Sequence, residues 1–152
     1  MKWRKDDLGK YVGAKEYIDT LLIPLIPLQF SNDGEAEKLA FQQEVMSILA
    51  NEIETELSGR LMLVPNYCYL KNSDKGTEAE RINQWIEDVE QQPFKHIILL
   101  TFDASWRKYE KELNGHFLWL PGMKSGDLQS KETHQLLRDQ VQELSEIIRS
   151  YW

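Results

Sequence analysis

The sequence contains a single cysteine, Cys68, among 152 residues, so no intrachain disulfide framework can form. A chain of this length buries enough surface to fold without a disulfide or a metal ion. It also lacks any apolar run of the roughly 20 residues that a membrane-spanning helix needs. The longest candidate, residues 20–30, is short and contains two prolines. We therefore expect one domain over residues 1–152, without membrane insertion.

Basic side chains are outnumbered by acidic ones, with 18 Lys and Arg against 25 Asp and Glu and a net charge of -7. Contacts to a phosphate backbone need a basic surface, so nucleic acid is not an expected partner. The first residues, MKWRKDDLGKY, lack the apolar core of a signal peptide. We expect a cytoplasmic protein.

Familiar catalytic and cofactor motifs are also missing. No G-x-G-x-x-G follows a strand, and no G-x-x-x-x-G-K-[ST] phosphate loop is present. Metal-ligand spacing such as H-E-x-x-H or C-x-x-C is absent, and so is the G-x-S-x-G elbow of serine hydrolases. The sequence predicts no cofactor and no metal site, and it leaves open whether the protein is an enzyme.

What the sequence does contain is an alternation of apolar runs and amphipathic segments. The apolar runs predict four strands, and the amphipathic segments predict an N-terminal helix and four further helices. The strands are expected at residues 20–30, 60–65, 95–102 and 116–121, and the helices at residues 6–19, 33–58, 77–92, 105–115 and 131–150.

This alternation predicts parallel strand pairing with right-handed crossovers. We expect a small three-layer α/β domain of about four mainly parallel strands, with helices on both faces and an extra N-terminal helix. An alternative is an α+β domain in which residues 116–121 form an antiparallel edge. Pro24 and Pro27 are expected to shorten the first strand, and residues 66–77 to form a long loop.

Side chains that can cap helices precede three of the predicted helices. Asn32 with Glu35, and Thr77 with Glu80, fit the reciprocal capping pattern, and Ser130 stands before the last helix. The helix at residues 33–58 also carries a second apolar stripe, formed by Phe41, Val45 and Ile48, beside its main one. This stripe is a candidate interaction surface, covered either by the N-terminal helix or by a protein partner or second copy.

Ligands of open parallel sheets bind outside the carboxyl ends of the strands. His96 and His116 stand at strand entries and are therefore expected to be structural. The candidate ligand-binding residues at the carboxyl end are Asn66, Tyr67, Asp103, Ser105 and Arg107, and Lys124 falls at the same end. Asp103 follows an apolar strand and precedes a helix, so it can act as an N-cap, as a functional carboxylate, or as both.

Three stretches together carry a resemblance to a known family: residues 1–30, HIILLTFD and FLWLPG. With them the chain resembles the YpiF-like family of uncharacterised Bacillus-type proteins, which has no established activity. Genes of that family tend to lie beside those of the menaquinol–cytochrome c reductase complex, so the resemblance implies an accessory role near respiration.

Two functions from different classes fit these observations. The first is a non-catalytic interaction or accessory protein, indicated by the missing motifs and the second stripe of the long helix. The second is a protein or enzyme that binds a small molecule or a nucleotide-like ligand at the carboxyl ends of the strands. A pocket at that edge with Asp103 facing into it would favour the second.

Overall fold

The computed structural model describes residues 1–123 and 126–152. The elements that it describes follow one another as α1 (Lys5–Val12), β1 (Thr20–Leu28), α2 (Asp33–Glu56), β2 (Leu61–Leu63), β3 (Tyr67–Leu70), α3 (Lys75–Val89), β4 (His96–Thr101), the 3-10 helix η1 (Ala104–Glu112), β5 (His116–Trp119) and α4 (Lys131–Ser150).

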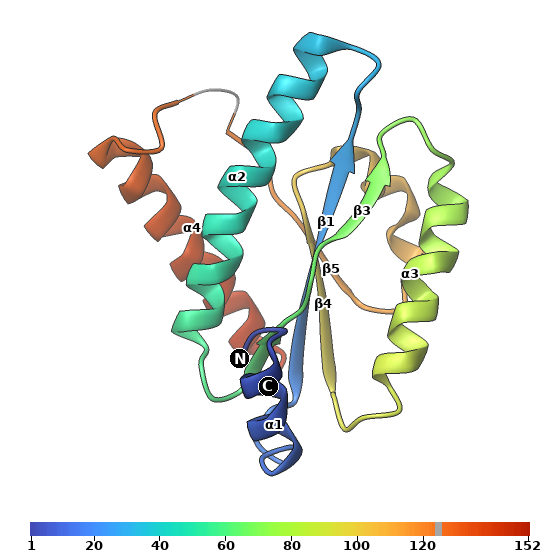
Figure 1. Ribbon diagram of the computed structural model, residues 1–152, viewed down its shortest axis with the longest axis vertical. Coiled ribbons are helices and arrows are strands. Elements are labelled where there is room, and N and C mark those ends of the chain that lie inside the picture. Colours follow the sequence, from blue (N-terminus) through green and yellow to red (C-terminus); the bar gives the residue numbers. More distant parts are fainter. Residues whose placement is uncertain (124–125) are drawn as a thin grey trace.

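The expected three-layer α/β arrangement is confirmed. A parallel sheet in the order β2-β1-β4-β5 forms the middle layer, and β3 also pairs with β1. Helices α2 and α4 cover one face of the sheet, while α3 and η1 cover the other (Figure 1). The alternative with an antiparallel edge is wrong, because β5 pairs parallel to β4 from Ile98–His116 to Thr101–Trp119.

The two prolines do not shorten β1, which is the central strand and spans nine residues. Residues two apart on a strand direct their backbone groups to the same neighbour. Leu22 accepts a hydrogen bond from Val64 N, so Pro24 also faces the β2–β3 edge. Its missing N–H falls between β2 and β3, where the ladder is interrupted. Pro27 faces the opposite neighbour, β4, beyond the last residue that pairs with β1.

Residues 66–77 are not the predicted loop, because Tyr67–Leu70 form β3 in register with Leu25–Leu28 of β1. Tyr67 and Tyr69 are buried on the α3 face of the sheet. The pairing connects residues about 40 positions apart in the sequence, so no local sequence pattern predicts it. The expectation of a long loop there is therefore wrong for its first half.

Two of the three predicted caps are confirmed. Asn32 accepts a hydrogen bond from Glu35 N at the start of α2, and Ser130 accepts one from Thr133 N at the start of α4. The predicted cap Thr77 is wrong, because α3 begins two residues earlier and Asp74 accepts from Thr77 N instead. An aspartate accepts such a bond as readily as a threonine does, so the helix that begins earlier is still capped.

The second stripe of α2 has a neighbour within the chain, but it is not α1. Helix α4 packs against α2, whereas Tyr11 of α1 clusters with Ile18 and with Met62 of β2. Val45 is fully buried, and Phe41 and Ile48 are half-buried. That these three side chains form an interaction surface stays a prediction.

Side chains from both chain ends close the amino end of the sheet. Arg60 donates to both carboxylate oxygens of Asp19, at 2.9 and 3.0 Å, and its guanidinium lies 3.9 Å from the ring centroid of Trp152. Trp152 Nε1 donates to Thr20 Oγ1 at 2.8 Å. The Met1 ammonium pairs with Glu54 at 2.7 Å. Figure 1 shows both termini at this end of the molecule.

His96 and His116 also lie at the amino end, and the His116 ring stacks on Tyr151 with centroids 4.0 Å apart. Burial, together with His96, lowers the pKa of His116. Both histidines are therefore placed far from the carboxyl ends of the strands, as expected.

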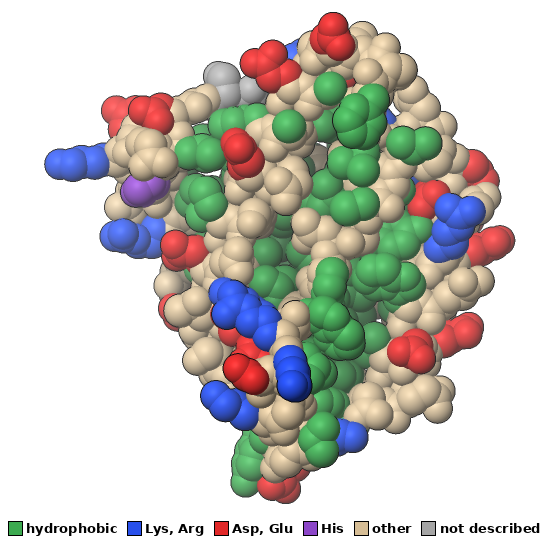
Figure 2. Space-filling view, viewed as in Figure 1, with side chains coloured by type: hydrophobic (Ala, Val, Ile, Leu, Met, Phe, Trp, Pro, Cys, Tyr) green, Lys and Arg blue, Asp and Glu red, His purple; other side chains and the backbone are tan. Residues whose placement is uncertain are grey.

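The outer edge of the β2–β3 side carries many hydrophobic side chains on one continuous strip of the surface (Figure 2). Exposed members of this strip belong to the N-terminal segment, to β3 and to α3. Among the described residues, no helix has both the length and the apolar character required to cross a bilayer.

We predict that Asp19→Asn lowers the free energy of unfolding at pH 7 by roughly 1–3 kcal/mol, the range for a hydrogen-bonded charged group. Burial alone would raise the pKa of the Asp19 carboxyl, but the bonds from Arg60 and Thr20 outweigh burial and hold it below the ordinary 3.8. A carboxyl with a depressed folded-state pKa stabilises the fold above its unfolded pKa, and this stabilisation is lost as the pH falls through the folded pKa.

Urea unfolding at several pH values checks this prediction. The deficit of Asp19→Asn relative to wild type is expected at neutral pH and should shrink below about pH 4. The control is Glu56→Gln, which breaks the exposed pair with Arg149 and should cost less than about 1 kcal/mol. A deficit that is the same at neutral and acid pH would contradict the assignment.

Candidate functional site

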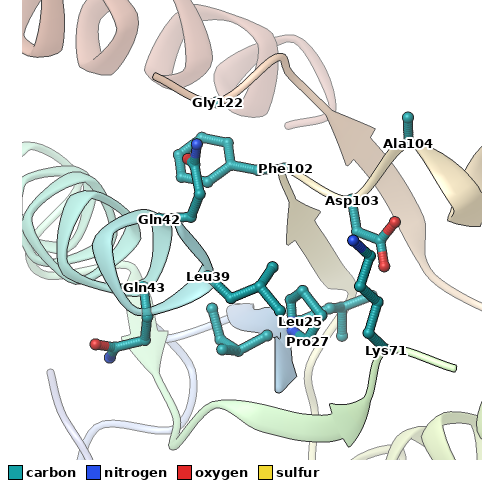
Figure 3. Close-up of a pocket in the computed structure, with 11 residues that line it drawn as sticks. Leu25, Pro27, Leu39, Gln42, Gln43, Lys71, Phe102, Asp103, Ala104 and Gly122 are labelled. Atoms are coloured by element: carbon teal, nitrogen blue, oxygen red, sulfur yellow. The ribbon is translucent and has the colours of Figure 1, made fainter. Parts of the chain in front are cut away.

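A crevice of about 210 Å³ opens at the carboxyl end of the sheet, beside the N-terminal half of α2 (Figure 3). It lies where β1 leads into α2 on one face and its neighbour β4 leads into η1 on the other. Because the connections after β1 and β4 leave the sheet on opposite faces, neither connection covers the space between the ends of these two strands. In open α/β sheets, this space is the usual ligand site.

The walls of the crevice come from five parts of the chain. The residues are Leu25, Ile26 and Pro27 of β1, Leu39, Gln42 and Gln43 of α2, Lys71 after β3, Phe102, Asp103 and Ala104 after β4, and Gly122 after β5. Figure 3 shows Gln42 and Phe102 on one side, with Lys71 and Asp103 opposite and Leu39 and Pro27 between them. The crevice therefore has an apolar floor and polar flanks.

Asp103 is both an N-cap and a wall of the crevice. Its Oδ1 accepts hydrogen bonds from Ser105 N at 3.0 Å and from Ser105 Oγ at 2.6 Å, which caps η1. Its Oδ2 accepts from the Tyr69 hydroxyl at 2.6 Å. A carboxylate offers about four lone-pair sites, so one site is left for a further donor.

A buried hydrogen-bond chain holds Asp103 in place from the α3 face of the sheet. Trp106, which is fully buried, donates from Nε1 to the Tyr69 hydroxyl at 2.8 Å, and that hydroxyl donates to Asp103. Burial and the nearby Asp103 carboxylate raise the pKa of Tyr69 far above its ordinary value. Tyr69 thus stays protonated at neutral pH and donates to Asp103.

The opposite flank is formed by a buried amide. Gln42 donates from Nε2 to the carbonyl of Met123, while its Oε1 is buried without a partner among the described residues. A side chain at position 122 would overlap this amide, so Gly122 permits the close approach. Lys71 donates to Glu35 at 2.7 Å, and this bond lowers the pKa of Glu35.

Comparison with known proteins gives a family and no activity. The model of the family described as "Protein of unknown function (DUF2487)" matches residues 9–152. The chain is also 31% identical over 157 residues to "Uncharacterized protein YpiF" of Bacillus subtilis (strain 168), covering 100% of this chain and 98% of that protein.

The chain belongs to this family. The resemblance to YpiF-like proteins is thereby confirmed. No solved structure matches the chain. What family members bind or catalyse therefore has to be argued from the geometry of the site.

Of the five predicted ligand-binding residues, only Asp103 lines the crevice. Ser105 is exposed and is held against Asp103. Arg107 is exposed, with its guanidinium 4.6 Å from the ring centroid of Trp119. Tyr67 donates its hydroxyl to buried Glu78 on the α3 face, and Asn66 lies in the break before β3. Lys124 lies outside the described residues.

The sequence contained one usable signal for the residues that were missed. Gln42 and Gln43 stand three and four residues after Leu39, where the main apolar stripe of α2 should continue toward Met46. Two amides at such positions indicate that this part of the helix faces something polar. Lys71 and Gly122 follow the ends of β3 and β5, and no pattern marks them.

We predict that Tyr69→Phe lowers the free energy of unfolding by about 1–3 kcal/mol, because it leaves buried Trp106 Nε1 without an acceptor. Tyr109→Phe is the matched control. The Tyr109 ring also packs edge-on against Trp106, but its hydroxyl makes no hydrogen bond within the described residues, so its loss should cost less than about 0.5 kcal/mol. Chemical denaturation of both variants measures the difference. Equal losses of unfolding free energy would contradict the hydrogen-bond chain from Trp106 through Tyr69 to Asp103.

Proposed function

We propose that this protein binds a small ligand with hydrogen-bond donors in the crevice at the carboxyl ends of β1 and β4. The observation that carries the proposal is the position of Asp103. Its carboxylate forms one wall of the crevice, and a buried tyrosine and tryptophan fix it there with one acceptor site left over. Preorganised acceptors of this kind bind donors without a cost for ordering the side chain.

The polar groups of the crevice define the class of ligand. Asp103 Oδ2 is the acceptor in the crevice wall, so it suits a molecule with a hydroxyl, amide or amine group at one end. The floor of Leu39 and Pro27 suits an apolar middle. Phosphate is disfavoured, because Asp103 would repel it and Lys71, the cation of the lining, is already paired with Glu35.

The volume supports a small ligand over a nucleotide-like one. About 210 Å³ equals the share of roughly seven water molecules in the liquid and is less than the roughly 300 Å³ at which drug-sized sites begin. A compact polar metabolite or an amino acid side chain fits this space, whereas a base with its ribose does not.

Binding suits the crevice better than catalysis. Asp103 already accepts three hydrogen bonds that hold the local structure, so moving a proton onto it would break them. We infer a non-catalytic accessory role in the cytoplasm. The exposed free thiol of Cys68 supports a reducing compartment.

Solution NMR of the full chain, titrated with simple probes, tests the proposal. Methylamine, acetamide and glycerol carry donors, whereas acetate is a control that carries only acceptors at neutral pH. We expect the donors to shift the backbone amide signals of residues 39–43 and 102–104, and acetate to leave them unchanged.

Variants separate binding in the crevice from general solvent effects. Gln42→Leu should remove most of the response, while Gln135→Leu on the exposed side of α4 should keep it. Responses to acetate as large as those to the donors, or no response at residues 102–104 with any donor, would reject the crevice as a ligand site.

A further inference from the structure

A second hollow, larger and more apolar than the crevice, lies on the α3 face of the sheet at the β2 edge. Its volume is about 740 Å³, and it forms a groove between the N-terminal segment with α1 on one side and α3 on the other. The floor comes from β1 and β2, and the aromatic walls from Trp3, Tyr11, Trp85 and Phe94. We call it the α1–α3 groove.

The rims of the α1–α3 groove expose large hydrophobic side chains. Trp3 is 62% exposed and Val12 69% exposed on the α1 side, and Trp85 is 38% exposed on the α3 side. Tryptophans in this setting are enriched at protein interfaces, where they contribute much of the binding energy. The groove is thus expected to be covered in the functional protein.

The charges on the two sides of the α1–α3 groove indicate which molecule occupies it. Residues 1–15 contain five basic and two acidic side chains, whereas α3 contains four acidic and two basic ones. In Figure 2, blue side chains lie beside the hydrophobic strip on the N-terminal side, and red side chains together with some blue ones lie over α3. The N-terminal segment that borders the groove is therefore net basic, and α3 is net acidic.

Two charged residues line the groove itself, one on each side. Lys15 belongs to the α1 side and Asp88 to the α3 side. Neither forms an ion pair with another described residue. Lys15 Nζ only approaches the Tyr11 ring, 5.7 Å from its centroid. Each of these charges is available to a partner of opposite sign.

We propose that the α1–α3 groove is the interface of a homodimer, with a second copy of the chain as its occupant. An isologous interface joins one surface to itself, so the surface must be self-complementary. A twofold axis along the groove sets the basic side of each protomer against the acidic side of its partner. An axis across the groove would set like charges together, so the charges select the first arrangement.

This arrangement pairs Lys15 of each protomer with Asp88 of its partner, twice per dimer. It covers Trp3, Val12 and Trp85 in the same contact and leaves the crevice at the other end of the sheet open. The proposal does not depend on the ligand proposed above, because the two hollows have no lining residue in common.

Charge reversal tests the proposal, with the association of the full-length protein measured by sedimentation equilibrium over a concentration series. Lys15→Glu and Asp88→Lys should each weaken the dimer at least about tenfold, because each reversal creates two repulsive contacts. The double variant carrying both changes should regain the wild-type dissociation constant, since the reversed charges again face opposite ones.

Arg138→Glu and Glu143→Lys on the exposed side of α4 change the net charge by the same amounts and should leave association unchanged. Circular dichroism confirms that each variant is folded. A wild-type protein that stays monomeric, or single variants that associate like wild type, would overturn the proposal. A double variant whose association remains weak would also overturn the proposal, because Lys15 and Asp88 would then not face each other.

A small apolar ligand is the competing occupant, and 8-anilinonaphthalene-1-sulfonate serves as its probe. If the protein is monomeric and binds this dye in a manner that Trp85→Ala removes, the groove belongs to a small molecule and the dimer proposal fails. If the protein is dimeric, dye binding should rise only in the variants that dissociate.

Discussion

Pro24 and Pro27 withhold two backbone N–H groups from the central strand of the sheet, and the crevice and the α1–α3 groove both lie beside the missing donors. Without a donor at Pro24 the ladder to the edge strand breaks, and Val64 and Pro65 in that break line the α1–α3 groove. Without a donor at Pro27, β1 runs past its last pairing with β4, and this end of the strand, which pairs only with β3, lines the crevice. Prolines in a central strand are tolerated only where no bond is required, and here both absences leave usable space.

Asp103 shows how one carboxylate serves stability and binding together. A cap needs one oxygen turned toward the next helix, which leaves the second free to meet a buried hydroxyl. Tyr69 then ties the end of β4 to β3 across β1, so the crevice wall is rigid because it belongs to the core. Removing the Asp103 side chain would therefore also remove the cap of η1 and the bond from Tyr69, so stability and ligand response must be measured separately.

Local signals predicted the architecture well. The caps at Asn32, Ser130 and Asp103 and the apolar run of β4 are properties of short segments, and all appear where expected. Contacts between distant segments were not predictable in this way. Strand β3 is four residues long and is stabilised by β1 and by buried tyrosines that bond to Glu78 and Asp103, so its own sequence resembles a loop. Likewise, Lys71 and Gly122 reach the crevice only because the fold brings β3 and β5 beside β1 and β4.

The two ends of the sheet differ: the amino end is closed by side chains, and the carboxyl end contains the crevice. At the amino end, an arginine, two tryptophan contacts and the terminal ammonium close the space around Asp19 and Thr20, using residues from both ends of the chain. Such closure fixes α1 and α4 against the strand entries, and α1 is one wall of the groove. A wall held by its own chain keeps its shape when a partner is absent. Little conformational entropy is then lost on association. Most of the free energy gained by burying the exposed tryptophans therefore contributes to binding.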